Sequence, residues 1–550
     1  MKKMVKSVLA SLAAVSLLAL VSCNDKKQEA KTETATGSKL NVMIEVEVQS
    51  LDPQQATDGT SFEVIADFTD GLKQMNADGS TADALCASET VSEDGLTYTF
   101  KIRDDAFWSN GDPVTADDFV FGWQRAVDPK IASEYSYMMS EIGQIKNSFE
   151  IIEGKLPIEE LGVKALDEKT LQVELIVPVS YFDSILYFPT FYPVNRKFYE
   201  SVGDTFGTSA STVLSNGAFI LTDYQPAALS FTLAKNEKYY DAANVKLSGL
   251  NYQVLKDSQQ ALMAYQNGNL DIVKLSGDQV DQIKDDPEFK AIGAGYLWYI
   301  SPMMDKVPEL ANLNFRKALS YAIDRESIVK NVVKDGSMAS YTPVPAEFAY
   351  SNEGKDFTTT QKEFPELCDS DTAKAAEFYE AAKAELGKDS FTFEMIVDDT
   401  TVQQNVAAVI KEQIEKTLPG VTINLRVEPK KQRVKDMQDG SFELALTRWG
   451  PDYADPMTYL GMWVTNNPNN YGLWTNAEYD SLIEKCVTGE YSQKPAERWE
   501  TLKAAEKIVL EDAVIIPLYQ QADACMVNES VKNIEFHPVA LNRVYKRTTK

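Results

Sequence analysis

The segment at residues 448–456, Arg-Trp-Gly-Pro-Asp-Tyr-Ala-Asp-Pro, brings together a carboxylate, aromatic rings and a stiff Gly-Pro step. The carboxylate of Asp452, beside the face of Trp449, would attract an ammonium group through ion pairing and cation–π attraction. The chemistry indicated is therefore binding of a positively charged group. The alternative is an ordinary turn between a strand and a helix, in which Trp449 is a core residue.

The residues on either side predict that this segment leaves a strand and enters a helix. Residues 442–446 alternate with period two, which is typical of a strand. Asp455-Pro456 is a helix-start signal, with Asp as the N-cap and Pro at the first helical position.

From residue 391 onward, strands and helices alternate. We predict strands at 391–397, 421–427 and 442–446, and helices at 402–418 and 431–438. This order is typical of a mainly parallel sheet covered by helices. Ligands of such sheets bind outside the carboxyl ends of the strands, where the segment 448–456 would lie.

Three further patterns predict elements outside this region. Thr115 is expected to cap a helix that has acids in its first turn. Residues 314–333 are amphipathic, with Phe315 and Leu319 at helical spacing, and predict one helix. Residues 514–519 predict a buried strand that returns to the first region of the chain.

Length and charge limit the class of protein. A chain of 550 residues is too long for one core, so two or three domains are expected. The net charge is −28, and it would be −31 without the leader that holds Lys2, Lys3 and Lys6. A field of this sign repels nucleic acid and acidic lipid headgroups, which excludes a nucleic-acid partner and is compatible with cationic or zwitterionic ligands.

The N-terminus predicts export and lipidation. A basic start and a short apolar run lead to Leu20-Val21-Ser22-Cys23, which resembles a bacterial lipobox. We expect residues 1–22 to be a removed signal peptide and Cys23 to carry the lipid. Residues 23–39 would then be the lipidated cysteine and a polar tether, and the protein would be anchored outside the cytoplasmic membrane. The alternative is a plain signal peptide with an incidental cysteine.

Motifs for catalysis, metals and cofactors are largely missing. The chain has one histidine, His537, and no His-Glu-x-x-His, Cys-x-x-Cys or Gly-x-Ser-x-Gly pattern. Cys86, Cys368, Cys486 and Cys525 lie far apart and are expected to be small core residues, with one disulfide as the alternative in an exported protein. We therefore expect binding without turnover, with no cofactor and no metal. A hydrolase that uses His537 remains the alternative of a different class.

Several short motifs follow one another in the order found in a known family. They are Glu-Val-Gln-Ser-Leu-Asp-Pro at 47–53, Asp-Gly-Leu-Thr-Tyr-Thr-Phe at 94–100, the segment 108–120, Trp-Gln-Arg at 123–125, 161–167, Asn-Gly-Ala at 216–218, 316–325 and Asp-Tyr-Ala-Asp-Pro at 452–456. Together they resemble the extracytoplasmic oligopeptide-binding proteins of ABC importers (solute-binding protein family 5, peptide/nickel-binding group). The resemblance covers nearly the whole mature chain.

The resemblance implies an α/β, two-lobed, periplasmic-binding-protein-like fold of type II with an extra inserted domain. Domain I would comprise 40–69, 195–298 and 520–550, domain II 70–194, and domain III 299–519. It also implies a monomer that encloses oligopeptides between its lobes and delivers them to the permease of an ABC importer. Relatives that bind oligosaccharide, haem or nickel chelate keep those ligands as alternatives.

The resemblance also assigns residues to the ligand. Asp452 matches the acid that binds the peptide α-ammonium group, and Trp449 and Gly450 match the loop that pairs with the peptide backbone. The segment Thr57, Asp58 and Gly59 matches the opposing side. Further expected cleft residues are Tyr135, Asn216, Gly217, Tyr299 and Tyr519.

The residues expected at the peptide carboxyl end differ from those of the family's enteric members. At the positions where enteric members place basic residues, this chain has Leu446 and Gln403, which carry no charge. Either the carboxyl end is not fixed, or Lys274, Lys430 or Arg448 receives it.

Overall fold

The computed structural model describes residues 37–77, 79–276, 278–351, 354–359, 364–367, 369–492, 494–539 and 541–550. The expected signal peptide, the lipidation site Cys23 and most of the tether lie outside the described residues, as does Cys368. Gly37–Lys550 cluster as one unit. Within the described ranges, no helix is long and apolar enough to cross a membrane.

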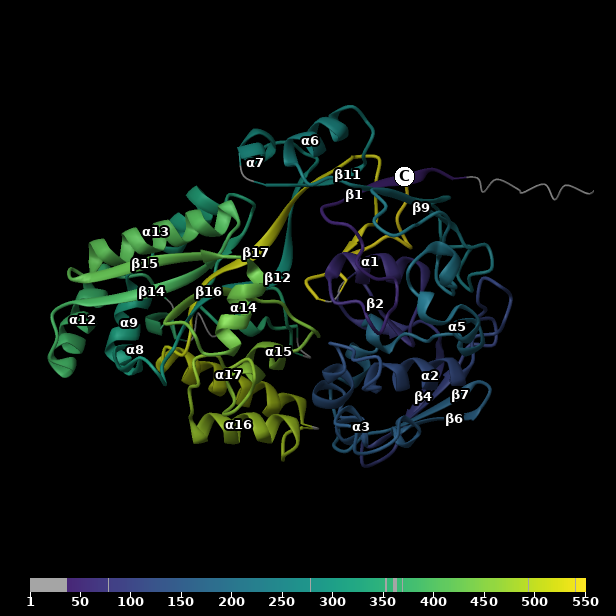
Figure 1. The fold of residues 1–550 in the computed structure, drawn as a ribbon, viewed down its shortest axis with the longest axis horizontal. Helices are drawn as coiled ribbons and strands as arrows, with labels where there is room; N and C mark the ends of the chain where they lie inside the picture. The colour runs from purple at the N-terminus through teal and green to yellow at the C-terminus, as the bar shows by residue number, and fades with distance from the viewer. Residues whose placement is uncertain are drawn as a thin grey trace, which may run out of the picture. The chain divides into compact units, whose positions relative to one another are not determined.

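One large mixed sheet runs through the described part of the chain (Figure 1). Its strands, in spatial order, are β15 (Val421–Glu428), β14 (Phe391–Asp398), β16 (Leu444–Trp449), β12 (Phe289–Pro302), β17 (Ile516–Val527), β11 (Ile272–Leu275), β1 (Lys39–Ile44), β10 (Gly249–Val254), β9 (Ser230–Lys235) and β8 (Phe219–Leu221), with β13 (Met338–Ala339) pairing β17. The long strands β12 and β17 lie side by side and join its two halves.

A second, antiparallel sheet has the order β4 (Cys86–Val91), β5 (Thr97–Ile102), β7 (Thr170–Glu174), β6 (Val163–Asp167). Two small pairs are β2 (Lys73–Met75) with β3 (Thr81–Asp83), and β18 (Glu535–Phe536) with β19 (Arg543–Val544). The described α-helices are α1 (Gly59–Phe68), α2 (Ala116–Val127), α3 (Ser148–Ile152), α4 (Phe182–Ile185), α5 (Arg196–Val202), α6 (Ser258–Gln266), α7 (Asp278–Ile283), α8 (Pro308–Ala311), α9 (Leu313–Tyr321), α10 (Arg325–Ile328), α12 (Thr372–Leu386), α13 (Thr401–Thr417), α14 (Lys430–Gln438), α15 (Met457–Leu460), α16 (Ala477–Val487) and α17 (Pro495–Glu511).

The predicted strand–helix alternation after residue 391 is confirmed. β14 pairs in parallel with both β15 and β16, so the carboxyl ends of three parallel strands meet at one edge. α13 covers this part of the sheet with an apolar stripe at helical spacing that includes Val406, Ile410 and Ile414, all buried. Removing these side chains from water is the main force that holds the helix on the sheet.

The predicted cap of α2 is also confirmed. The Thr115 side chain accepts a hydrogen bond from the backbone N–H of Asp118, and the Asp118 carboxylate accepts one from the N–H of Thr115. This capping box satisfies two N–H groups at the start of the helix.

The prediction of a single helix at 314–333 is wrong, because the helix is interrupted in two places. α9 ends at Tyr321, and Asp324 starts α10 by accepting from the N–H of Ser327 at 3.0 Å. Val329–Val333 then form a π-helical turn. The buried Arg325 guanidinium donates to the carbonyls of Ser320 and Pro517, and these contacts hold the chain outside a regular helix.

Candidate functional site

Strand β16 is longer than its sequence pattern predicts. Arg448 pairs with Trp298 and Trp449 pairs with Leu297 on β12, so both are strand residues and not part of the loop. The helix expected after Asp455-Pro456 is only the single turn α15. The loop that remains between strand and helix is short, and Asp452 lies within it.

Asp452 is half-buried and is hydrogen-bonded by the hydroxyl of Tyr137. Burial raises the pKa of the Asp452 carboxyl to about 7, and the hydrogen bond from Tyr137 lowers it in part. Among the described residues, Asp452 has no ion pair. Burial therefore destabilises the charged form of Asp452, and no counter-ion offsets this effect. A cationic ligand group at this position would stabilise the carboxylate.

Tyrosine rings surround Asp452. The negative charge of Asp452 raises the pKa values of Tyr135, Tyr137 and Tyr459, after the larger effect of burial. Asp58 also raises the pKa of Tyr135, which shows that Tyr135 lies near both acids. The structure therefore brings Tyr135 and the 57–59 segment to the neighbourhood of Asp452. Tyr137 and Tyr459 were not predicted, because no local pattern distinguishes them from other tyrosines.

The opposing segment starts helix α1. The Asp58 carboxylate accepts from the N–H of Ser61 at 3.0 Å and caps the helix. Thr57 and Gly59 are exposed, and a Cβ at Gly59 would have no neighbour within 4 Å. These two residues are thus accessible at the start of the helix.

Residues 448–450, at the end of β16, pack closely against aromatic side chains. A Cβ at Gly450 would lie 2.3 Å from the ring of Tyr296, so a larger residue there would have to displace that ring. The Arg448 guanidinium lies 4.1 Å from the centre of that ring and donates to Oε1 of Gln521 at 2.8 Å. The indole N–H of Trp449 is buried and has no partner in the described structure.

Two contacts brace the Asp452 loop. Asp455 accepts two hydrogen bonds from the Arg498 guanidinium, at 2.7 and 2.8 Å. Tyr453 stacks on Tyr181, with ring centres 4.7 Å apart. Because Asp455 is engaged in this way, Asp452 is the carboxylate of the loop that remains available to a ligand.

The other expected cleft residues lie elsewhere in the packing. Asn216 is buried, and its side-chain oxygen accepts from the N–H of Asp70 at 2.7 Å, while Gly217 donates to Phe68 at the end of α1. Tyr299 is buried in β12, and Tyr519 is buried in β17, where its hydroxyl meets the Gln403 amide at 3.2 Å. None of the contacts described for these four residues reaches Asp452.

The candidates for the peptide carboxyl end differ in their surroundings. Lys274 is already paired with Glu45 and Asp523, at 2.9 and 3.0 Å. Lys430 and Arg448 form no ion pair in the part of the chain that the structure describes. Lys274 is therefore the least suitable of the three.

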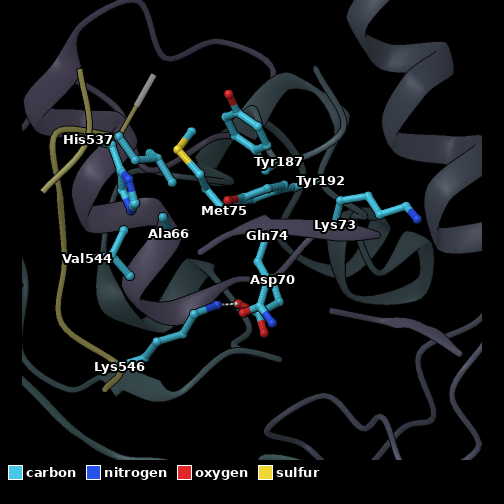
Figure 2. Close-up of a pocket in the computed structure, with 11 residues that line it drawn as sticks. Ala66, Asp70, Lys73, Gln74, Met75, Tyr187, Tyr192, His537, Val544 and Lys546 are labelled. Atoms are coloured by element: carbon cyan, nitrogen blue, oxygen red, sulfur yellow. Dashed lines mark hydrogen bonds and ion pairs between the residues drawn. The ribbon is translucent and has the colours of Figure 1, made fainter. Parts of the chain in front are cut away.

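His537 and the described cysteines have structural positions. His537 is buried, and burial together with the charge of Lys546 lowers its pKa to about 4. It lines a cavity of about 20 Å³ beside the C-terminal segment (Figure 2), room for little more than one water molecule. Cys86, Cys486 and Cys525 are free and buried, as predicted. Among the described residues, no group of three or more His, Cys, Asp or Glu side chains could hold a metal ion.

Comparison with known proteins defines the class. Residues 81–471 match the family described as bacterial extracellular solute-binding proteins, family 5 (middle). The chain belongs to this family, whose members bind solutes outside the cytoplasm, and the predicted α/β periplasmic-binding-protein-like fold is confirmed.

Three relatives illustrate the match. The chain is 33% identical to a dipeptide-binding protein of Lactococcus lactis, over 97% of both chains. It is 36% identical to the substrate-binding domain of an oligopeptide ABC transporter of Bacillus anthracis, with a TM-score of 0.77 over 94% of this chain and 100% of that one. It is 34% identical to Listeria monocytogenes OppA bound to peptide, with a TM-score of 0.76 over 94% and 99%.

Proposed function

We propose that this chain is a lipid-anchored receptor that captures oligopeptides and delivers them to the permease of an ABC importer. The observation that carries the proposal is Asp452, a carboxylate with no cationic partner among the described residues, set among tyrosines near the start of α1. A peptide α-ammonium group is a ligand that such a carboxylate binds strongly. The printed names of the Lactococcus and Listeria relatives support peptides as the ligand class.

The peptide would bind as an added strand. Trp449 and Gly450 on one side and Thr57 to Gly59 on the other would pair with its backbone, while Tyr135 and Arg448 contact it from the walls. Four of the expected cleft residues would support this surface from the interior, by contacts that hold α1, β12 and β17 in place. They are Asn216, Gly217, Tyr299 and Tyr519. Backbone pairing does not read side chains, so broad selectivity is expected.

The domain division fits the sheet topology. The antiparallel β4–β7 sheet falls within 70–194, and β14, β15 and β16 fall within 299–519. β12 and β17 each cross a proposed boundary between domains I and III, near residues 298 and 519. These two strands would serve as the hinge about which the lobes of a monomer close on the ligand.

Ligand identity can be tested directly on the purified protein. Native mass spectrometry is expected to show bound species with a spread of peptide masses. Protein freed of its bound ligand by unfolding and refolding should rebind short peptides. Its radius of gyration in X-ray scattering should then be smaller than that of the ligand-free protein. A single sugar, haem or metal-chelate mass would contradict the peptide proposal, and hydrolysis of the added peptides would contradict binding without turnover.

Lipid anchoring gives a separate prediction. Cys23→Ser is expected to release the protein from the membrane fraction into the soluble fraction, because a polar tether without acyl chains has no apolar surface to insert. Cell fractionation and intact-mass measurement check this outcome. Cys486→Ser is the matched control and should leave the protein in the membrane fraction. Retention of Cys23→Ser in the membrane would contradict the anchor.

A further inference from the structure

A cavity of about 350 Å³ is lined by residues of α2, α5 and the 3-10 turn Ile158–Glu160. The helices α2 and α5 pack against one another (Figure 1). These elements carry none of the residues that surround Asp452. The volume lies at the lower end of the range for small-molecule sites, about 300–1,000 Å³. The cavity beside His537, with about 20 Å³, is far below that range.

One face of α2 forms a wall of this cavity. Its lining residues recur every three or four positions, which places them on one side of the helix. They are Asp117, Val120, Phe121, Gln124, Arg125 and Asp128. The ring of Tyr199, on α5, meets that of Phe121 edge to face, with ring centres 5.2 Å apart. Ile131 and Ile158 add aliphatic surface. Walls of this kind suit an apolar or aromatic ligand body.

Gln124 brings an unpaired amide to the cavity. Its side chain is only 8% exposed, and in the described part of the chain it forms no hydrogen bond to the protein. The buried amide of Gln54 shows the usual arrangement, since it donates to the carbonyls of Thr190 and Tyr192 and accepts from Arg125. Buried side-chain amides are normally paired in this way, because an unpaired one lowers stability. A polar ligand group would supply the partner that Gln124 lacks.

The two arginines that line the cavity already have acidic partners. Arg125 donates to both carboxylate oxygens of Asp52, at 2.5 and 3.0 Å. Arg196 donates to Asp117, at 3.0 Å, and lies over the ring of Phe121. Their positive charges are therefore compensated within the protein, and an anionic ligand would have to compete with these carboxylates.

Two carboxylates of the lining have no such partner. Neither Asp128 nor Glu159 forms an ion pair with any residue that the structure describes. Asp128 accepts one hydrogen bond from the backbone N–H of Lys130, at 2.9 Å. It is also the C-cap of α2, at the end of the helix where the dipole is negative. The uncompensated charge at the cavity is thus negative, which favours a cationic ligand.

We infer that this cavity is a second binding site, which takes a small organic amine with an apolar or aromatic body. The ammonium group would contact Asp128 and Glu159 at the C-terminal end of α2. The body would pack against Phe121 and Tyr199, and a polar group of the ligand would bond to the amide of Gln124. The inference does not depend on the proposed peptide function, because the two sites share no residue.

The test compares probes of opposite charge by ligand-observed NMR titration. Wild-type protein is expected to bind tryptamine with a Kd of about 1 mM or tighter, and indole-3-propionate at least about tenfold more weakly. Asp128→Asn combined with Glu159→Gln should weaken tryptamine binding about tenfold. Asparagine can still accept from the N–H of Lys130, so the end of α2 should be preserved. Glu150→Gln combined with Glu160→Gln, an equal charge change at exposed positions, is the control and should change the affinity less than about twofold.

The peptide site must be separated from the cavity, because Asp452 could also attract an amine. If Asp452→Asn removes tryptamine binding and the double change at Asp128 and Glu159 does not, the amine occupies the peptide site. The second site is then wrong, and the proposed peptide function stands. The second site is also wrong if neither tryptamine nor 4-phenylbutylamine binds with a Kd below about 10 mM.

Gln124→Met tests the amide. Methionine has a similar length and no hydrogen-bonding amide. Because the amide of Gln124 makes no hydrogen bond to the described protein, the melting temperature should stay within about 2 °C of the wild type or rise. Tryptamine binding should weaken about fivefold, the value of one hydrogen bond. A lower melting temperature with unchanged tryptamine affinity would show that Gln124 supports the fold and contradict its assignment to a ligand.

Discussion

Asp452→Asn is expected to weaken binding of peptides with a free α-amino group about 100-fold, and of N-acetylated peptides less than about threefold. Removing one partner of a desolvated, hydrogen-bonded charge pair costs about 2–5 kcal/mol, and each 1.4 kcal/mol is a factor of ten. Asparagine has the same shape and can still accept the hydrogen bond from Tyr137, so the loop should keep its conformation. Calorimetry with matched free and acetylated peptides measures both values.

Glu141→Gln is the control for the loss of a negative charge in this region. Glu141 is exposed and acts on Tyr137 electrostatically. We expect less than about a twofold change for either class of peptide, because an exposed charge contributes little. Equal losses for free and acetylated peptides in Asp452→Asn would contradict the role assigned to Asp452.

Peptide affinity is expected to fall about tenfold per pH unit below pH 7. The pKa of Asp452 is raised to about 7, so below that pH the carboxyl is protonated and neutral in the free protein. An ammonium ligand binds the ionised form, so binding near pH 7 should release protons. Above about pH 8 the ligand's own α-amino group loses its proton, so affinity should fall again. Calorimetry in buffers of different ionisation enthalpy measures affinity and proton release together.

Other groups titrate in the same range and must be separated from Asp452. The pKa of Asp67 is raised by burial to about 8, and those of Asp118 and Asp183 to about 6. His537, with its pKa near 4, is neutral throughout. Since Asp452→Asn leaves all of these groups in place, it should abolish the loss of affinity at low pH. Persistence of that loss in the variant would assign it to another group.

Much of the fold follows from local sequence patterns. The strand–helix alternation after residue 391 and the capping of α2 depend on neighbouring residues, and each was predicted and is confirmed. The helix expected at 314–333 is interrupted where Asp324 caps α10, a local signal, and where Arg325 donates to the carbonyl of Pro517, a residue remote in sequence. The length of β16 was underestimated for the same reason, since pairing with β12 extends it to Trp449.

The sequence by itself therefore determined the residue types of the site and the strand end that carries Asp452. Only the tertiary structure decided its surroundings: the hydroxyl of Tyr137 on Asp452 and the pairing of Asp455 with Arg498. The physical reason is that capping and periodicity act between residues a few positions apart. Burial, counter-ions and pKa values depend on which distant segments meet when the chain folds.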